Sequence, residues 1–228
     1  MLNGLGYCVQ TVNKNSNKNS SPRADGGAVS FLFDHQGKRK YLTVSERNAF
    51  LAAAALQPFH TRMFCFVLAY TGARVSEVLA LTPRQIDGAA GVIVIESLKK
   101  RRRGIYRALP IPSELFRELD RVYHVQFAQH DERLANQRIW TWCRTTAWNH
   151  VKACMVEANI SGSQACPKGL RHAFGVSVVQ SRIPINLLKK WLGHSRLETT
   201  EIYTAAVGAE EQAIASQFWA TFQNSSSR

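Results

Sequence analysis

The stretch that decides the fold is KGLRHAFGVSVVQSRIPINLLKKWLGHSRLETTEIY, residues 168–203. It places a lysine, an arginine, two histidines and a tyrosine at the ends of short apolar segments. Pro184 starts the second segment and Gly193 ends it, which is typical of a helix with proline in its first turn and glycine just past its last. We therefore predict helices over 171–180 and 184–192, with the polar side chains gathered at their ends.

The composition indicates one large, basic domain. The 228 residues are 45% hydrophobic, which is enough to bury a core. The 29 Lys and Arg outnumber the 16 Asp and Glu, which gives a net charge of +13. This charge favours a polyanion such as nucleic acid as the partner. Five cysteines without a CxxC pair indicate neither a disulfide framework nor a zinc site. No apolar run is long enough to span a membrane and no signal peptide is seen, so we expect a cytoplasmic protein.

Ahead of the deciding stretch, the chain divides into a leader and a domain. We expect residues 1–42 to form a flexible basic leader with a possible short hairpin, and residues 43–228 to form the domain. Thr43-Val-Ser-Glu46 has the spacing of a capping box, which predicts a helix start. A second helix should run from Pro58 to about Tyr70 and end at Gly72.

The β signal is limited to two short runs, 91–96 and 105–109, joined by the cationic segment SLKKRRRG. They predict an antiparallel hairpin with a basic tip. Trp148 and Val151 are expected to face the core from a helix over 145–157. Further helices are expected from 113 and over 209–222, with a polar linker at 128–138. The predicted fold class is α+β, mostly helical, with one small antiparallel sheet.

Four motifs carry a family resemblance. The segment YTGARVSEVLAL, residues 70–81, places an arginine at the turn between two predicted helices. With the segments KGLRH, LGHS and TTEIY of the deciding stretch, it resembles the catalytic signature of the tyrosine recombinases, the phage integrase family. The resemblance covers roughly residues 43–222. Family members usually carry a separate helical DNA-gripping domain ahead of the catalytic one, and we expect no full domain of that kind here.

Arg74, Arg171, His194 and Tyr203 are the predicted centre of the site. A phosphodiester under attack spreads charge over its equatorial oxygens, and arginine meets that charge best with planar, bidentate donors. Tyr203 is the candidate nucleophile. A phenol with a pKa of about 10 is mostly neutral at pH 7, so attack requires cationic neighbours or a base. His194 is expected either to hydrogen-bond a phosphate oxygen or to accept the tyrosine proton.

Supporting roles are expected for other residues of the motifs. Lys168 stands where a histidine is usual, so it is expected to contact the phosphate as a cation. Glu77 is expected to hold the guanidinium of Arg74, and His172 to orient the site or contact phosphate. The resemblance also implies a lysine on the hairpin as general acid, and Lys99 is the first candidate with Lys100 as the alternative. The basic tip should contact the DNA backbone through Lys100, Arg101, Arg102 and Arg103.

The predicted function is site-specific DNA recombination, and the chain is predicted to be an enzyme. The resemblance implies attack by Tyr203 to give a 3′-phosphotyrosyl link and a free 5′ hydroxyl, with no metal or other cofactor. Double-stranded DNA is the expected partner, bound by a homotetramer because strand exchange joins two duplexes. The apolar helix after Tyr203 either docks on a neighbouring subunit or covers its own core. A type IB topoisomerase and a non-catalytic DNA-binding regulator are the alternatives.

Overall fold

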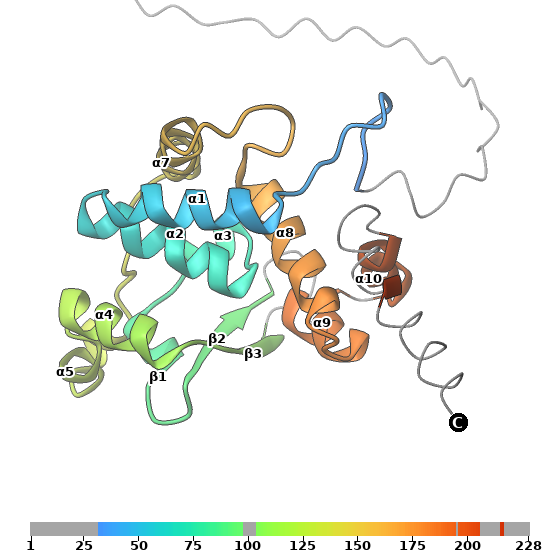
Figure 1. Cartoon of the computed structure of the whole chain (residues 1–228). Coiled ribbons are helices and arrows are strands. Elements are labelled where there is room, and N and C mark those ends of the chain that lie inside the picture. The colour runs from blue at the N-terminus through green and yellow to red at the C-terminus, as the bar shows by residue number, and fades with distance from the viewer. Residues whose placement is uncertain (1–31, 98–103, 195, 206–214, 217–228) are drawn as a thin grey trace, which may run out of the picture.

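The structure, a computed structural model, describes residues 32–97, 104–194, 196–205 and 215–216, and helices dominate it (Figure 1). The α-helices of the first half are α1 (Val44–Ala55), α2 (Phe59–Thr71), α3 (Val75–Val78) and α4 (Ser113–Tyr123). Those that follow are α5 (Val125–Gln129), α6 (Glu132–Ala135), α7 (Arg144–Glu157), α8 (Pro167–Gln180), α9 (Ile185–Leu192) and α10 (Glu198–Glu201). Two 3-10 helices, η2 (Pro83–Gln85) and η3 (Ile202–Ala205), complete the helical part.

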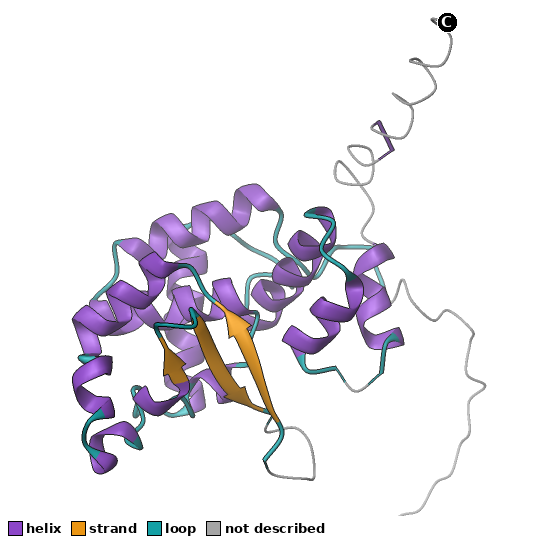
Figure 2. Ribbon diagram, turned by 90° about the horizontal axis from the view of Figure 1, so that it is seen from below, coloured by secondary structure: helices purple, strands orange, loops and turns teal. Residues whose placement is uncertain are grey.

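Three short strands form an antiparallel sheet in the order β1 (Ile86–Asp87), β2 (Val92–Glu96) and β3 (Tyr106–Pro110). In the predicted hairpin Val92 pairs with Pro110 and Glu96 with Tyr106. Figure 2 shows the sheet lying along one side of the helical body. The α+β fold class, mostly helical with a small antiparallel sheet, is therefore confirmed. The strand β1 was not predicted, and the tip of the hairpin, residues 98–103, lies outside the described residues.

Local signals placed the first two helices correctly. The backbone N–H of Glu46 donates to the Thr43 hydroxyl at 3.2 Å, and the Thr43 N–H donates back to the Glu46 carboxylate at 2.8 Å. This reciprocal capping box starts α1. Gly72 ends α2 in the left-handed region, with φ of +60°. A Cβ at Gly72 would also come within 2.6 Å of the Phe174 ring of α8, so this turn needs glycine for space as well.

Two hydrophobic cores lie on either side of α8. The larger core gathers side chains of α1, α2, the sheet and α7, and it includes Leu170 and Ala173 of α8. The smaller core consists of Leu32, Tyr41, Val176, Val178, Leu188, Leu192, Ile202 and Tyr203. Because α8 contributes to both cores, it fixes the position of α9 and of the segment that carries Tyr203 relative to the main body.

Two expectations about the middle of the chain were wrong. Residues 128–138 are not a plain polar linker, because they contain the end of α5 and all of α6. Ala128 and Ala135 are buried there, and Asp131 caps α6 by accepting the N–H groups of Arg133 and Leu134. Trp148 is 44% exposed rather than in the core, whereas Val151 is fully buried as predicted. The Trp148 ring instead lies 5.8 Å from the ammonium group of Lys152.

The ends of the chain are described only in part. Of the possible hairpin in the leader, the structure describes a bridge between Phe33 and Arg39 around a turn at residues 34–38. The helix expected over 209–222 lies outside the described residues except for Ala215 and Ser216, which are helical. In the part that the structure describes, no helix is both long enough and apolar enough to cross a membrane.

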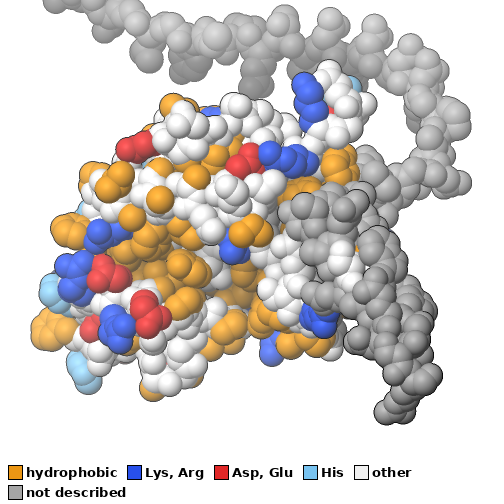
Figure 3. All heavy atoms as spheres, viewed as in Figure 1, with side chains coloured by type: hydrophobic (Ala, Val, Ile, Leu, Met, Phe, Trp, Pro, Cys, Tyr) orange, Lys and Arg blue, Asp and Glu red, His pale blue; other side chains and the backbone are white. Residues whose placement is uncertain are grey.

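Exposed hydrophobic side chains gather on one face of the helical layer. Figure 3 shows this face between α1 and α4. The exposed large apolar residues of α1, α2 and the α1–α2 connection are Val44, Leu56, Phe59 and Tyr70. A groove of about 360 Å³ lies beside it, where α1, α2 and α8 meet, and Leu51, Tyr70, Phe174, Val178 and Ile183 are among its lining residues. Its polar lining residues are Arg47, Asn48, Ser177 and Ser181, so the groove has both apolar and polar parts.

Candidate active site

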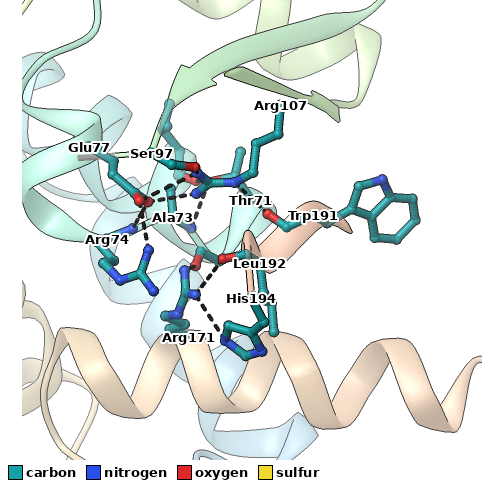
Figure 4. Close-up of polar contacts among 12 residues, drawn as sticks. Thr71, Ala73, Arg74, Glu77, Ser97, Arg107, Arg171, Trp191, Leu192 and His194 are labelled. Carbon is teal, nitrogen blue, oxygen red and sulfur yellow. Dashed lines mark hydrogen bonds and ion pairs between the residues drawn. The ribbon is translucent and has the colours of Figure 1, made fainter. Parts of the chain in front are cut away.

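Arg74 is held at the start of α3 by a buried carboxylate. Its backbone N–H donates to Oε2 of Glu77 at 2.9 Å, and its Nη1 donates to Oε1 at 2.8 Å (Figure 4). The Glu77 side chain is completely buried, whereas 28% of the Arg74 side chain is exposed. Nε and Nη2 of Arg74 make no hydrogen bond to the described part of the chain. One edge of the guanidinium is therefore anchored and the other is open to a ligand.

Glu77 is ionised despite its burial. Burial raises the pKa of Glu77, but the hydrogen bonds and charges of Arg107 and Arg74 outweigh burial and lower the pKa overall. Nη2 of Arg107 donates to Oε2 of Glu77 at 2.6 Å. Glu77 is therefore shared by two arginines, and the prediction that it contacts the guanidinium of Arg74 matches the geometry.

Arg171 is anchored by two backbone carbonyls. From α8, its Nη1 donates to the carbonyl of Gly72 and its Nη2 to the carbonyl of Leu192, both at 2.7 Å. These carbonyls lie at the ends of α2 and α9, where helix carbonyls lack partners within the helix. Burial and the charge of Arg74 lower the pKa of Arg171 to about 10, so it stays protonated at neutral pH. Figure 4 shows the guanidinium groups of Arg74 and Arg171 turned toward the same space.

His194 follows the left-handed Gly193, which ends α9 with φ of +65°. Its Nε2 lies 3.3 Å from Nη2 of Arg171, and its Nδ1 lies 3.1 Å from the hydroxyl of Thr200. Because a guanidinium only donates, Nε2 must be the acceptor, and the proton of the neutral ring lies on Nδ1. Burial and the charges of Arg171 and Arg74 lower the pKa of His194 to about 3. The imidazole is therefore neutral at pH 7, with an acceptor nitrogen beside Arg171.

Tyr203 is covered by protein in this conformation. Its side chain is 1% exposed, and its hydroxyl lies 3.3 Å from Nδ1 of His172. Its ring stacks on His194, with centroids 6.4 Å apart and planes at 8°. Burial raises the pKa of Tyr203 to about 12, although Arg171 and Arg74 act in the opposite direction. A Cβ at Gly175 would come within 2.5 Å of the ring, so this residue leaves space for the tyrosine.

The other predicted residues of α8 lie near this pocket. Nε2 of the buried His172 has no partner among the described residues. Burial, then the charges of Lys168 and Arg171, lower the pKa of His172 to about 4, so this imidazole is also neutral at pH 7. Lys168 is exposed in the first turn of α8, which begins at Pro167 rather than at the predicted residue 171.

The structure thus brings together most of the predicted residues. Hydrogen bonds join Arg74 to Glu77 and Arg171 to His194, and the two guanidinium groups are turned toward the same space. The ring of Tyr203 lies parallel to that of His194. The remaining candidates, Lys99, Lys100, Arg101, Arg102 and Arg103, lie outside the described residues, so their roles stay predictions. Among the described residues, no three His, Cys, Asp or Glu side chains gather where they could hold a metal ion.

Sequence reasoning missed Arg107. It lies on β3, shares the buried face of that strand with Leu109, and contacts Glu77, Ser97 and the carbonyl of Trp191 (Figure 4). The alternation of the strand points to it, because residues 107 and 109 must lie on the same face. A charged residue at a position that alternation assigns to the core is a signal for a buried polar partner.

Comparison with known proteins identifies relatives of this chain. The model of the family described as "Phage integrase family" matches residues 40–209. Tyrosine recombinase XerD of Haemophilus ducreyi is 28% identical over 154 residues, which cover 65% of this chain and 50% of XerD. The chain therefore spans about half the length of the curated relatives it matches.

Solved structures have the same fold. The crystal structure of XerA recombinase matches with a TM-score of 0.64 and 24% identity, over 78% of this chain and 64% of that chain. The Tn1549 transposon integrase in complex with transposon right end DNA matches with a TM-score of 0.62 and 17% identity, over 82% and 68%. Since the family match covers well over half of the sequence and the fold agrees, the chain belongs to the phage integrase family.

Proposed function

We propose that this protein is a site-specific DNA recombinase of the tyrosine type, which cleaves and rejoins DNA through Tyr203. The observation that carries the proposal is the convergence of Arg74, Arg171 and a neutral His194 from three separate elements. Each is anchored on one side by protein, and Arg74 keeps free donors on the other. An arrangement of this kind supplies fixed donors to a phosphate whose charge increases in the transition state.

The reaction exchanges one phosphate ester bond for another. The Tyr203 oxygen forms a bond to phosphorus as the bond to the 5′ oxygen breaks, which gives a 3′-phosphotyrosyl link and a 5′ hydroxyl. That hydroxyl then attacks the link of a partner strand and releases the tyrosine. Because the number of phosphate ester bonds is unchanged, the reaction requires neither a nucleotide nor a redox cofactor.

Side chains of the site are assigned to each proton transfer in this proposal. We assign acceptance of the tyrosine proton to Nε2 of His194, because Nε2 is unprotonated and the Nδ1–H is taken by Thr200. In the covered conformation Nε2 accepts from Arg171 and the pKa of His194 is about 3, so this role requires that DNA binding frees Nε2 and raises its pKa. The same tautomer makes donation from His194 to a phosphate oxygen less suitable. We assign the general acid for the 5′ oxygen to Lys99 or Lys100, and contact with the phosphate to Lys168. His172 is assigned to orienting Tyr203, given the 3.3 Å contact between them.

Tyr203 must move before it attacks. A hydroxyl on a side chain that is 1% exposed cannot reach a DNA phosphate. We therefore infer that assembly on DNA releases the hydroxyl from His172 and turns it toward the two arginines. The anchored arginines would stay in place during this change.

Double-stranded DNA is the proposed substrate. The net charge of +13 supports it, as does the fold shared with an integrase solved in complex with transposon right end DNA. We assign backbone contacts to the basic tip at residues 100–103 and propose a homotetramer on DNA in the cytoplasm. The groove between α1, α2 and α8 has apolar and polar lining residues, so it suits an amphipathic helix from a neighbouring copy.

The test uses nicked duplexes tiled over the DNA of the source element. We expect a protein–DNA adduct that survives denaturing electrophoresis, and we expect the attached peptide to contain Tyr203. Tyr203→Phe should bind the same duplexes with unchanged affinity and form no adduct. An adduct on another residue, or one that persists in this variant, would refute the assignment. Relaxation of supercoiled DNA without exchange between two sites would favour a type IB topoisomerase.

A further inference from the structure

We propose that Arg107 is a positioning residue for strand cleavage, which holds Arg74 and His194 in register without touching DNA. This inference rests on the proposed recombinase function. It starts from a simple observation: Arg107 is a buried arginine inside the site that none of the catalytic roles above uses.

All three nitrogens of the Arg107 guanidinium are occupied by protein. Nε donates to the carbonyl of Trp191 at 2.7 Å, Nη1 to the hydroxyl of Ser97 at 3.0 Å, and Nη2 to Glu77 at 2.6 Å. The side chain is only 4% exposed. Arg107 therefore has no face available for a phosphate, unlike Arg74.

Its first connection leads to Arg74. Glu77 accepts from Arg107 and Arg74 through both of its oxygens. With Arg107 present, the buried carboxylate is neutralised from two sides and needs only one edge of Arg74. Without Arg107, the carboxylate would be left to Arg74 alone, and the guanidinium of Arg74 would be drawn inward, away from the phosphate position.

Its second connection leads to His194. The carbonyls of Trp191 and Leu192 are consecutive acceptors at the end of α9, and they are taken by Arg107 and Arg171 respectively. A Cβ at Gly193 would lie 3.2 Å from Nη1 of Arg107, so the guanidinium packs directly on the residue before His194. Arg107 thereby joins β3 to the turn that presents the histidine.

Both connections depend on the geometry of the guanidinium as well as on its charge. Lysine cannot replace it, because a single ammonium group at the end of a flexible chain cannot span Glu77, Ser97 and the Trp191 carbonyl in fixed directions. The proposal therefore predicts that Arg107→Lys keeps the charge but loses the register. A displacement of about 1 Å in such an assembly is enough to lower the rate of a chemical step by ~100-fold.

The experiment measures single-turnover cleavage at saturating nicked DNA, together with DNA affinity and thermal unfolding. We expect Arg107→Lys to lower the cleavage rate by about 100-fold while affinity stays within about 3-fold of the wild type. Arg117→Lys is the matched control, because it makes the same charge-conserving change in an exposed ion pair with Glu114 on α4. It should leave all three quantities unchanged.

The outcomes separate the two levels of the proposal. A cleavage rate in Arg107→Lys equal to that of the wild type, or a fall in rate matched by an equal fall in affinity, would overturn the role of Arg107 alone. No adduct with the wild type would overturn the proposed function and this inference with it. If Arg107→Lys does not fold, Ser97→Ala carries the test, because it removes one anchor and keeps the ion pair. It should slow cleavage several-fold at unchanged affinity, and an unchanged rate would again overturn the role.

Discussion

The arginine cluster (Arg74, Glu77, Arg107 and Arg171) and the tyrosine pocket (His172, Gly175 and Tyr203) differ in the contacts that hold them. In the cluster, hydrogen bonds of 2.6–2.8 Å join charged side chains to each other and to helix ends. In the pocket, the tyrosine is held by packing and by one contact of 3.3 Å.

We infer from this difference that the two regions have different roles in the proposed reaction. Donors that are fixed before the reaction stabilise developing charge without the cost of reorganising them. A nucleophile held mainly by packing can be withheld until DNA and neighbouring subunits are in place. His194 belongs to both regions, because it contacts Arg171 through Nε2 and stacks on Tyr203 with its ring.

The largest expected effect comes from breaking the arginine cluster. Arg171→Ala should lower the cleavage rate by about 100- to 1,000-fold or more, because a fixed donor to the phosphate is lost. It should also destabilise the fold, since the carbonyls of Gly72 and Leu192 lose their charged partner. Single-turnover assays on nicked DNA and thermal unfolding measure the two effects separately.

Arg171→Lys is the control for charge. It retains the cation but not two donors in fixed directions, so its cleavage rate should also be low. Full activity in this variant would show that the cluster acts through charge alone, and the contrast between the two regions would then lose its geometric basis.

The tyrosine pocket is tested by filling its space. Gly175→Ala places a methyl group against the Tyr203 ring, so we expect the free energy of unfolding to fall by about 1–3 kcal/mol. If the ring is displaced toward solvent, the pKa of Tyr203 should fall from about 12 toward the ordinary value of about 10. Ultraviolet difference titration, with Tyr203→Phe to assign the signal, measures that change.

Ser177→Ala, on the same helix, is the matched control and should leave the titration unchanged. A Gly175→Ala protein with both wild-type stability and a wild-type tyrosine titration would mean that the pocket is looser than its packing suggests.

The last expected effect concerns pH and disappears near neutral pH. Burial lowers the pKa of His172 to about 4, below the unfolded value of about 6.5, so the unfolded chain binds the proton more readily. Stability from the neutral ring is therefore present above pH 6.5 and is lost as pH falls toward 4. The loss between pH 7 and pH 5 should be about 2 kcal/mol from this group.

Urea unfolding at the two pH values measures this effect. His172→Gln should reduce the pH dependence, and His150→Gln is the control, because His150 is a half-buried histidine on α7. An equally steep pH dependence in wild type and His172→Gln would show that the pocket does not penalise the charged imidazole.

Much of the fold was predictable because its signals are local. The reciprocal bonds of Thr43 and Glu46, the left-handed Gly72 and the pairing of β2 with β3 all follow from short spacings in the chain. Residues 128–138 and Trp148 were misjudged because their burial depends on which elements pack nearby, and polarity or size alone does not determine that.

The sequence by itself determined the family, the hairpin and the longer helices. It also identified Arg74, Arg171, His194 and Tyr203 as candidates, because these features depend on residue types at short spacings. Only the tertiary structure decided that Arg107 joins Glu77 to α9, and that Tyr203 lies covered against His172. Those contacts join residues 30 to 84 positions apart. Their geometry arises from the packing of two cores around α8, which no local pattern records.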